Sequence, residues 1–149
     1  MKLPPDLERK ILDQAGQGGL VSEIELPAPP STNHLFVAIT IKGKPRRVPS
    51  KEYLAWQRAV RQTVLRLKSP TAYPVGVELT LVGKWNRQRD AGNVEKPITD
   101  ALVACNVLAD DNLLHVTDLS IHYRPSAGEP RVRVRLIELT RGLFEEAIK

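Results

Sequence analysis

Four aspartates and one lysine in a short stretch of the chain have the types and spacing to do chemistry. They are Asp90, Lys96, Asp100, Asp110 and Asp111. Carboxylate oxygens are the ligands that hard divalent cations such as Mg²⁺ prefer, and Mg²⁺ usually takes one or two of them together with water and substrate phosphate. The chain as a whole carries a formal charge of +5. Acidic residues gathered in a basic protein therefore indicate a divalent metal that acts on a polyanion.

The expected places of these residues suit hydrolysis of a phosphodiester. In that reaction a metal orients the attacking water and offsets charge on the leaving oxygen. We expect Asp90 just past the end of a strand, Lys96 in the next helix, and residues 110–111 in the following loop. A strand end, a helix start and a loop can meet at one edge of a sheet.

Each of these residues also has an ordinary structural interpretation. Residues 110–112 (Asp-Asp-Asn) are common in turns, because such side chains bond to nearby backbone. Asn93 can cap the start of a helix by accepting a bond from a free amide. Asp100 follows Lys96 by four residues, which is the spacing of a helical ion pair. Spacing alone leaves the metal site and these interpretations open.

The elements that must position these residues are two main helices and a set of strands. Ser50 can cap a helix, and apolar residues follow it at three- and four-residue steps from Tyr53 to Leu67. Alternation and turn residues predict strands over 20–26, 37–41, 46–48, 75–81, 114–123 and 131–139, with a hairpin turn at 42–45. This order predicts an α+β fold with a small mixed or antiparallel sheet.

The second helix carries the candidate lysine and is expected to start near Asn93. Its predicted apolar stripe consists of Val94, Ile98, Ala101, Leu102 and Cys105. Asn93, Lys96 and Asp100 cluster within about 60° on another face. Pro97 is expected in or beside the first turn, where a missing N–H does no harm.

The chain divides into three predicted parts. Residues 1–19 read as an N-terminal helical appendage with a Gly-rich linker, 20–140 as one domain, and 141–149 as a C-terminal tail. The single cysteine, Cys105, excludes an internal disulfide framework. No apolar run approaches the roughly 20 residues that span a bilayer, and no signal-peptide pattern opens the chain. We therefore expect a cytoplasmic protein that does not enter a membrane.

The acidic stretch resembles the RusA family of Holliday junction resolvases, small Mg²⁺-dependent DNA endonucleases of recombination and repair. The family's pattern is an Asp-x-Asp-Asn element, a Lys three residues on, an Asp four beyond that, and a later Asp-Asp pair. This chain has Asp-Ala-Gly-Asn at 90–93, then Lys96, Asp100 and 110–111 at the same spacing. Residues 29–33 (Pro-Pro-Ser-Thr-Asn) are similar to the family's Pro-Pro-Ser-x-Asn element.

The resemblance covers about residues 22–139. It implies an α+β homodimer, bacterial or phage-encoded, that binds branched DNA and nicks two strands of a four-way junction symmetrically. Mg²⁺ is the implied cofactor, and Mn²⁺ is a possible substitute. The implied roles are metal ligands Asp90, Asp111 and Asp110, catalytic residues Asp90, Lys96 and Asp111, and supporting residues Asn93 and Asp100.

Gly92 is the departure from the family pattern, because the family has its second aspartate at this position. Glu95 is an alternative carboxylate, but it lies about 100° around the helix from Lys96. Nuclease activity is therefore expected either to persist in weakened or altered form or to be lost. One alternative is a non-catalytic module that binds branched DNA after losing a metal ligand. Another is a phage DNA-processing nuclease that prefers other branched substrates.

Basic residues upstream of the acidic stretch are expected to bind DNA phosphates, which give affinity without reading sequence. They are Lys42, Lys44, Arg46, Arg47, Lys84, Arg87 and Arg89. For any one of them a solvated surface is the alternative. Trp85 borders the predicted site, and we expect it to pack rather than to stack on an opened base.

Overall fold

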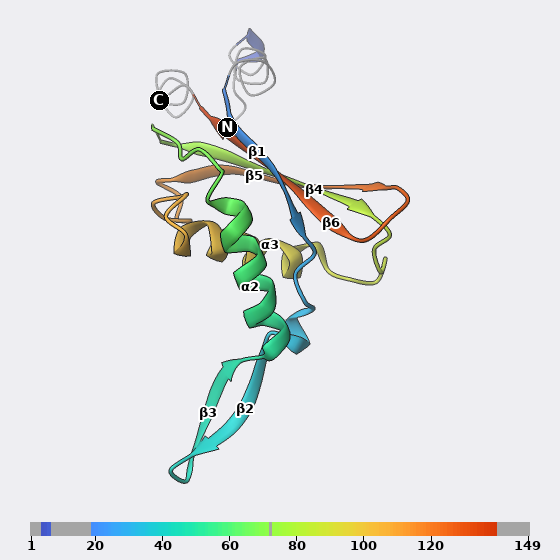
Figure 1. The fold of residues 1–149 in the computed structure, drawn as a ribbon. Helices are drawn as coiled ribbons and strands as arrows, with labels where there is room; N and C mark the ends of the chain where they lie inside the picture. The colour runs from blue at the N-terminus through green and yellow to red at the C-terminus, as the bar shows by residue number, and fades with distance from the viewer. Residues whose placement is uncertain (1–3, 7–18, 72, 140–149) are drawn as a thin grey trace.

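The computed structural model describes residues 4–6, 19–71 and 73–139 (Figure 1). The helices and strands are β1 (Leu20–Pro27), the 3₁₀ turn η1 (Thr32–His34), β2 (Phe36–Ile41), β3 (Lys44–Pro49), α2 (Lys51–Val64), β4 (Val75–Gly83), α3 (Ala91–Ala104), β5 (Val116–Pro125) and β6 (Arg131–Glu138). Most of the predicted N-terminal appendage and all of the predicted tail lie outside the described residues. No helix in the described ranges is long and apolar enough to cross a membrane.

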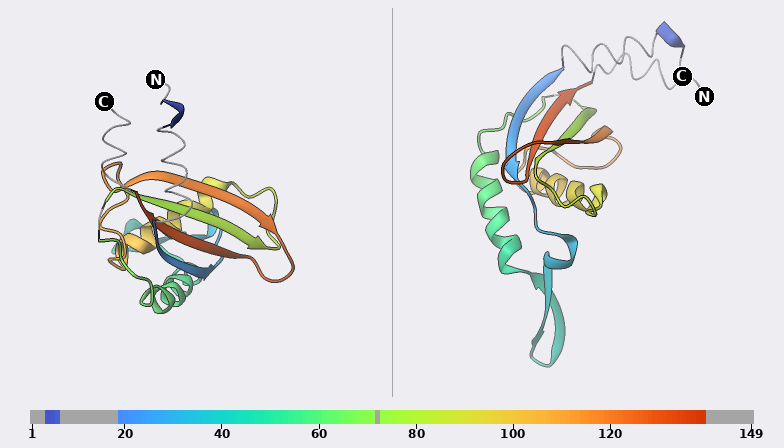
Figure 2. Two further views of the ribbon diagram at one scale, coloured as in Figure 1. Left: turned by 90° about the horizontal axis from the view of Figure 1, so that it is seen from above. Right: turned by 90° about the vertical axis from the view of Figure 1, so that its right-hand side faces the viewer.

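Four strands form a mixed sheet in the order β1-β6-β4-β5, and β2 and β3 form a separate two-stranded sheet. β5 runs parallel to β4, and α3 makes the crossover between them. β6 runs antiparallel to both β1 and β4. α2 and α3 lie on the same face of the four-stranded sheet (Figure 2). The predicted α+β class, with two main helices and a mixed sheet, is confirmed.

The core lies between this sheet and the two helices. Its fully buried side chains come from both layers and include Leu26, Val60, Leu79, Ile98, Leu102 and Leu136. The predicted stripe of the second helix is confirmed at Val94, Ile98 and Leu102, which are buried, whereas Ala101 and Cys105 are half-buried at its edge. Burial of this stripe fixes which face of α3 is left for the polar residues.

α2 begins where its sequence predicts. The Ser50 hydroxyl accepts a hydrogen bond from the Tyr53 amide at 3.0 Å and so caps the helix. Trp56 lies in the buried stripe, and its indole Nε1 donates to the Pro27 carbonyl at 2.9 Å. This bond ties the helix to the end of β1, beside the Pro-Pro-Ser motif.

The predicted hairpin is present as β2 and β3. Lys42 and Gly43 form its turn with φ values of 51° and 76°, the left-handed backbone that a tight two-residue hairpin needs. The hairpin projects from the body beyond the N-terminal end of α2 (Figure 1). We call this segment, residues 36–49, the arm.

α3 begins earlier than predicted. Its first residue is Ala91, two residues before Asn93, and its N-cap is Asp90, so the interpretation of Asn93 as the helix cap is wrong. The Asn93 amide donates to the Asp90 carbonyl at 3.2 Å, which shows that the first turn already includes Asn93. Pro97 therefore lies in the second turn, where it has no N–H to offer the Asn93 carbonyl. Burial of the apolar stripe maintains the helix despite this missing bond.

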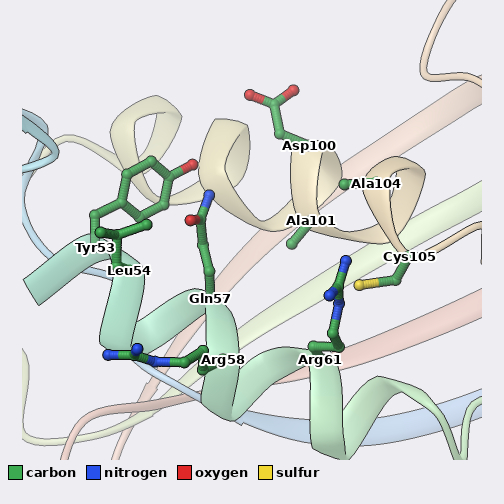
Figure 3. Close-up of a pocket in the computed structure, with 9 residues that line it drawn as sticks. All are labelled: Tyr53, Leu54, Gln57, Arg58, Arg61, Asp100, Ala101, Ala104 and Cys105. Carbon is green, nitrogen blue, oxygen red and sulfur yellow. The ribbon is translucent and has the colours of Figure 1, made fainter. Parts of the chain in front are cut away.

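A groove of about 400 Å³ runs between α2 and α3 (Figure 3). Its lining is partly apolar, with Leu54 from one helix and Ala101 from the other. Arg61 of α2 reaches toward α3 near Cys105, as Figure 3 shows. Asp100 stands on the α3 side of the groove, so the groove borders the polar face of that helix.

Candidate active site on helix α3

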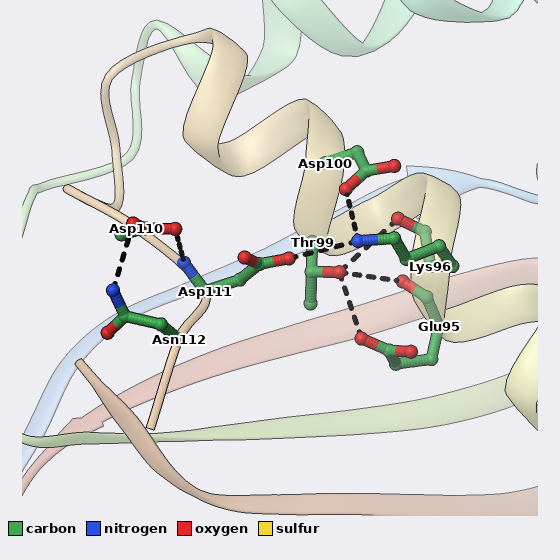
Figure 4. Close-up of polar contacts among 7 residues, drawn as sticks. All are labelled: Glu95, Lys96, Thr99, Asp100, Asp110, Asp111 and Asn112. Carbon is green, nitrogen blue, oxygen red and sulfur yellow. Dashed lines mark hydrogen bonds and ion pairs between the residues drawn. The ribbon is translucent and has the colours of Figure 1, made fainter. Parts of the chain in front are cut away.

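Lys96 connects two of the predicted acidic residues (Figure 4). Its Nζ lies 2.9 Å from Asp100 Oδ1 and 3.1 Å from Asp111 Oδ2. Asp100 is one turn further along α3, as the four-residue spacing predicts, whereas Asp111 comes from the loop that leads to β5. The helix and the loop after it therefore meet at this lysine. We call Lys96, Asp100 and Asp111 the Lys96 group.

The charges of this group stabilise one another. The two carboxylates raise the pKa of the Lys96 ammonium well above its usual value, and Asp100 contributes more than Asp111. The Lys96 ammonium in turn lowers the pKa of the Asp111 carboxyl. Lys96 and Asp111 are thus both charged at neutral pH. The Lys96 side chain is 63% exposed, so each ion pair adds at most about 1 kcal/mol to stability.

Asp110 shapes the loop that presents Asp111. Its Oδ1 accepts from the Asp111 amide at 2.7 Å, and its Oδ2 accepts from Asn112 Nδ2 at 2.9 Å. Asn112 Oδ1 accepts from the Leu114 amide at 3.0 Å. The interpretation of residues 110–112 as turn residues is therefore confirmed, and it coexists with the approach of Asp111 to Lys96.

Asp90 and Gly92 stand at the start of the same helix. The Asp90 side chain is exposed and accepts no capping bond from the helix amides. A Cβ placed on Gly92 would meet no atom within 4 Å. Gly92, Lys96 and Asp100 are separated by four residues each, so they share one stripe of α3. A carboxylate at position 92 would therefore fit and would lie one turn from Lys96.

The other candidates on α3 take different positions. Glu95 Oε1 accepts a hydrogen bond from Thr99 Oγ1 at 2.9 Å, so its carboxylate is engaged with a buried threonine (Figure 4). Asn93 is half-buried and contributes its backbone to the first turn. Glu95 thus has a structural partner of its own beside the Lys96 group.

The candidate acidic residues do not form a complete set of metal ligands. Within residues 4–6, 19–71 and 73–139, no three His, Cys, Asp or Glu side chains are placed to hold a metal ion. Asp111 faces Lys96 and Asp110 faces its own loop. Asp90 and Asp111 are nevertheless exposed carboxylates, which is the donor chemistry that suits Mg²⁺ when water and phosphate complete its shell.

The sequence around this site matches a known protein family. Residues 27–137 match the family model of the endodeoxyribonuclease RusA. The chain belongs to the RusA family. The matched segment runs from the end of β1 to β6 and includes the arm, both helices and the Lys96 group. No curated protein gives a significant match to the chain. The predicted resemblance is confirmed, and the family is one of DNA-cleaving hydrolases.

The RusA-family domain uses one of its predicted DNA-binding residues to join two motifs. Arg89 Nη2 donates to the backbone carbonyls of Pro29 at 2.7 Å and of Pro30 at 2.8 Å. Its guanidinium also lies 5.2 Å from the centre of the Trp85 ring. Burial lowers the pKa of Arg89. Arg89 therefore fastens the Pro-Pro-Ser segment to the loop that enters α3.

Trp85 and the remaining basic residues lie as follows. Trp85 is half-buried against the core, and its Nε1 donates to the Val82 carbonyl at 2.8 Å, which agrees with the expected packing role. Lys84 and Arg87 are exposed in the same loop. The cations of the arm are exposed as well: Lys42, Lys44, Arg46 and Arg47.

Sequence reasoning missed the backbone role of Arg89 and the arginines Arg58 and Arg61 beside the groove. A contact between Arg89 and a carbonyl 60 residues earlier leaves no periodic trace in the sequence. Arg58 and Arg61 occupy the exposed face of α2, where arginine is ordinary.

Proposed function

We propose that this chain is a Mg²⁺-dependent endodeoxyribonuclease that cuts Holliday junctions or related branched DNA. One observation carries the proposal: in a RusA-family domain, Lys96 stands between Asp100 and Asp111, with the exposed Asp90 at the start of the same helix. Carboxylates that can hold a metal and a cation that can reach the phosphate are the residue types that phosphodiester hydrolysis uses.

Asp90 and Asp111 are the residues that would hold the metal, and Asp110 supports them by fixing the backbone of Asp111. When bound, a divalent cation neutralises charge at the phosphate and lowers the pKa of its water. Mn²⁺ has similar ligand preferences and would substitute for Mg²⁺.

Lys96 would bring its ammonium to the scissile phosphate and stabilise the negative charge that develops there. Asp100 is a positioning residue in this scheme, because it contacts the ammonium and not the substrate. Asp111 would contact both the lysine and the metal. Its carboxylate has two oxygens, so it can make both contacts.

The DNA would be held by exposed cations on the arm and in the loop before α3. Symmetric cleavage of a four-way junction requires two related sites, so we propose that the protein acts as a homodimer. Arg89 would contribute to DNA binding through the loop that it holds, since its Nη2 is already committed to backbone carbonyls.

The test is cleavage of a synthetic four-way junction by the wild-type protein and by Asp111→Asn, with Mg²⁺ and with Mn²⁺. The proposal expects paired nicks from the wild type and a large loss in the variant. Equal cleavage by the two proteins would remove Asp111 from the mechanism. Competition with flap and duplex DNA separates a resolvase from a nuclease with other branched substrates.

A second candidate is a branched-DNA-binding module without nuclease activity. Gly92 favours it, because the second aspartate of the family's Asp-x-Asp-Asn element is missing here, and no three His, Cys, Asp or Glu side chains of the described residues are placed to hold a metal. Tight junction binding by the wild type with no cutting under either metal would establish this candidate.

A further inference from the structure

The arm is anchored at its base and free along its length (Figures 1 and 2). At the base, the Phe36 ring packs edge-on against Tyr53 of α2, with centroids 5.6 Å apart. The Ser50 amide donates to the Leu35 carbonyl at 2.8 Å. Beyond this point every residue of β2 is exposed. An isolated two-stranded hairpin is only marginally stable in water, so the arm gains from a binding partner.

One face of the arm combines aliphatic side chains with cations. Residues directly opposite each other on paired strands point to the same face. Ile41 is opposite Lys44, Ile39 is opposite Arg46, and Val37 is opposite Val48. Three aliphatic members are well exposed, Val37 at 45%, Ile39 at 39% and Ile41 at 47%, and Val48 is half-buried. We call these residues the aliphatic face: Val37, Ile39, Ile41, Lys44, Arg46 and Val48.

The charge of the arm favours a polyanion over a second copy of the chain. Residues 26–51 contain no Asp or Glu, whereas Lys42, Lys44, Arg46 and Arg47 all lie in the arm. Among the described residues these four cations form no ion pair. Two such arms placed face to face would repel each other, and DNA phosphates would neutralise them.

We propose that the arm enters the branch point of a DNA junction and lays its aliphatic face against base pairs exposed there. This inference rests on the proposed function, which supplies the branched substrate. Apolar side chains that wedge between stacked base steps must first unstack them. At a branch point the stacking is already interrupted, so Ile39 and Ile41 meet base faces at a lower cost than in a duplex. Lys44 and Arg46 bind the phosphates on either side.

Structure selectivity therefore resides in the isoleucines and general affinity resides in the cations. The test compares Ile39→Thr/Ile41→Thr with Lys44→Ala/Arg46→Ala, and threonine retains the strand preference of isoleucine. Ala38→Thr, on the opposite face of the arm, is the matched control. Each protein is titrated, in EDTA so that no strand is cut, with a four-way junction and with a duplex of one of its arms. A 2-aminopurine at the branch point reports unstacking there.

The isoleucine variant is expected to lose about tenfold in junction affinity and to keep its duplex affinity within about twofold. The 2-aminopurine signal that the wild type raises should fall in this variant. The cation variant should bind both DNAs more weakly, and its salt slope should fall by about one for each phosphate that the variant no longer neutralises. Ala38→Thr should match the wild type.

Three outcomes overturn the inference. They are an unchanged junction affinity in the isoleucine variant, an equal loss on junction and duplex, and a change in sedimentation of the DNA-free isoleucine variant, which would make the face a protein interface. Circular dichroism of each variant establishes that α2 and the sheet are intact. Failure of the proposed function is distinguishable, because it appears as the absence of cleavage with Mg²⁺ and with Mn²⁺, whereas this inference is measured by binding in EDTA.

Discussion

Asp111 Oδ2 lies 3.1 Å from Lys96 Nζ and so joins the loop before β5 to the middle of α3. The two residues are 15 positions apart in sequence, and the crossover between the parallel strands β4 and β5 brings them together. Because the pair is exposed, it contributes little to the free energy of unfolding. Its main effect is to fix the positions of the two charges.

Gly92→Asp should raise the rate of junction cleavage by at least about tenfold, since even outer residues of metal sites change activity by that much. The new side chain has open space, and an acidic residue in the first turn of a helix is favourable. The melting temperature should therefore not fall. Single-turnover cleavage measures the rate. Ala91→Asp, which adds the same charge to the same turn on another face, serves as the control and should give no gain.

Asp100→Asn should lower the cleavage rate by about tenfold, because a lysine held by one carboxylate samples more positions than a lysine held by two. Its effect on the free energy of unfolding should stay within about 0.5 kcal/mol. In a Lys96→Ala background the same substitution should cost nothing further, since its partner is gone. A full additional loss in that background would show that Asp100 acts independently of Lys96.

Arg89→Ala should reduce the free energy of unfolding by about 2 kcal/mol, because two charged hydrogen bonds to backbone carbonyls and the contact with Trp85 disappear. Urea unfolding measures the loss. Arg87→Ala removes an exposed cation from the same loop and should change stability by no more than about 0.5 kcal/mol. Equal stabilities of the two variants would contradict the role of Arg89 in holding the Pro-Pro-Ser segment against the loop before α3.

Ser50→Ala should cost about 1 to 2 kcal/mol, since the hydroxyl caps α2 and also donates to the His34 carbonyl. Thermal and urea unfolding both report this change. Ser69→Ala is the control, because the Ser69 hydroxyl is exposed and bonds only at 3.4 Å to the Asn106 carbonyl. A comparable loss in the two variants would argue against capping as the cause.

The local parts of the fold were predictable because their signals are local. The cap at Ser50, the apolar steps from Tyr53 to Val64 and the glycine-containing turn of the arm each reflect interactions within a few residues. The position of β6 between β1 and β4 depends on pairings across most of the chain. Neither its order nor its register follows from periodicity.

In the candidate site, too, local contacts are predictable from the sequence and tertiary contacts are not. The approach of Lys96 to Asp100 follows from helical spacing, whereas the approach of Asp111 requires the tertiary fold. Pro97 favours a later start of α3 than the structure has, because tertiary burial of the apolar stripe overrides the local preference. The charge of Arg89 predicts a phosphate contact, whereas its backbone carbonyl partners leave no signal in the sequence.

The open space beside Gly92 has a genetic consequence. Every glycine codon becomes an aspartate or glutamate codon through a change of its second nucleotide. Because the fold opposes neither residue at this position, a carboxylate can be gained or lost here in one mutational step without a folding defect. Selection for or against cleavage would then act on this one position. The arm, the core and the contacts of Arg89 with the Pro-Pro-Ser segment would not change.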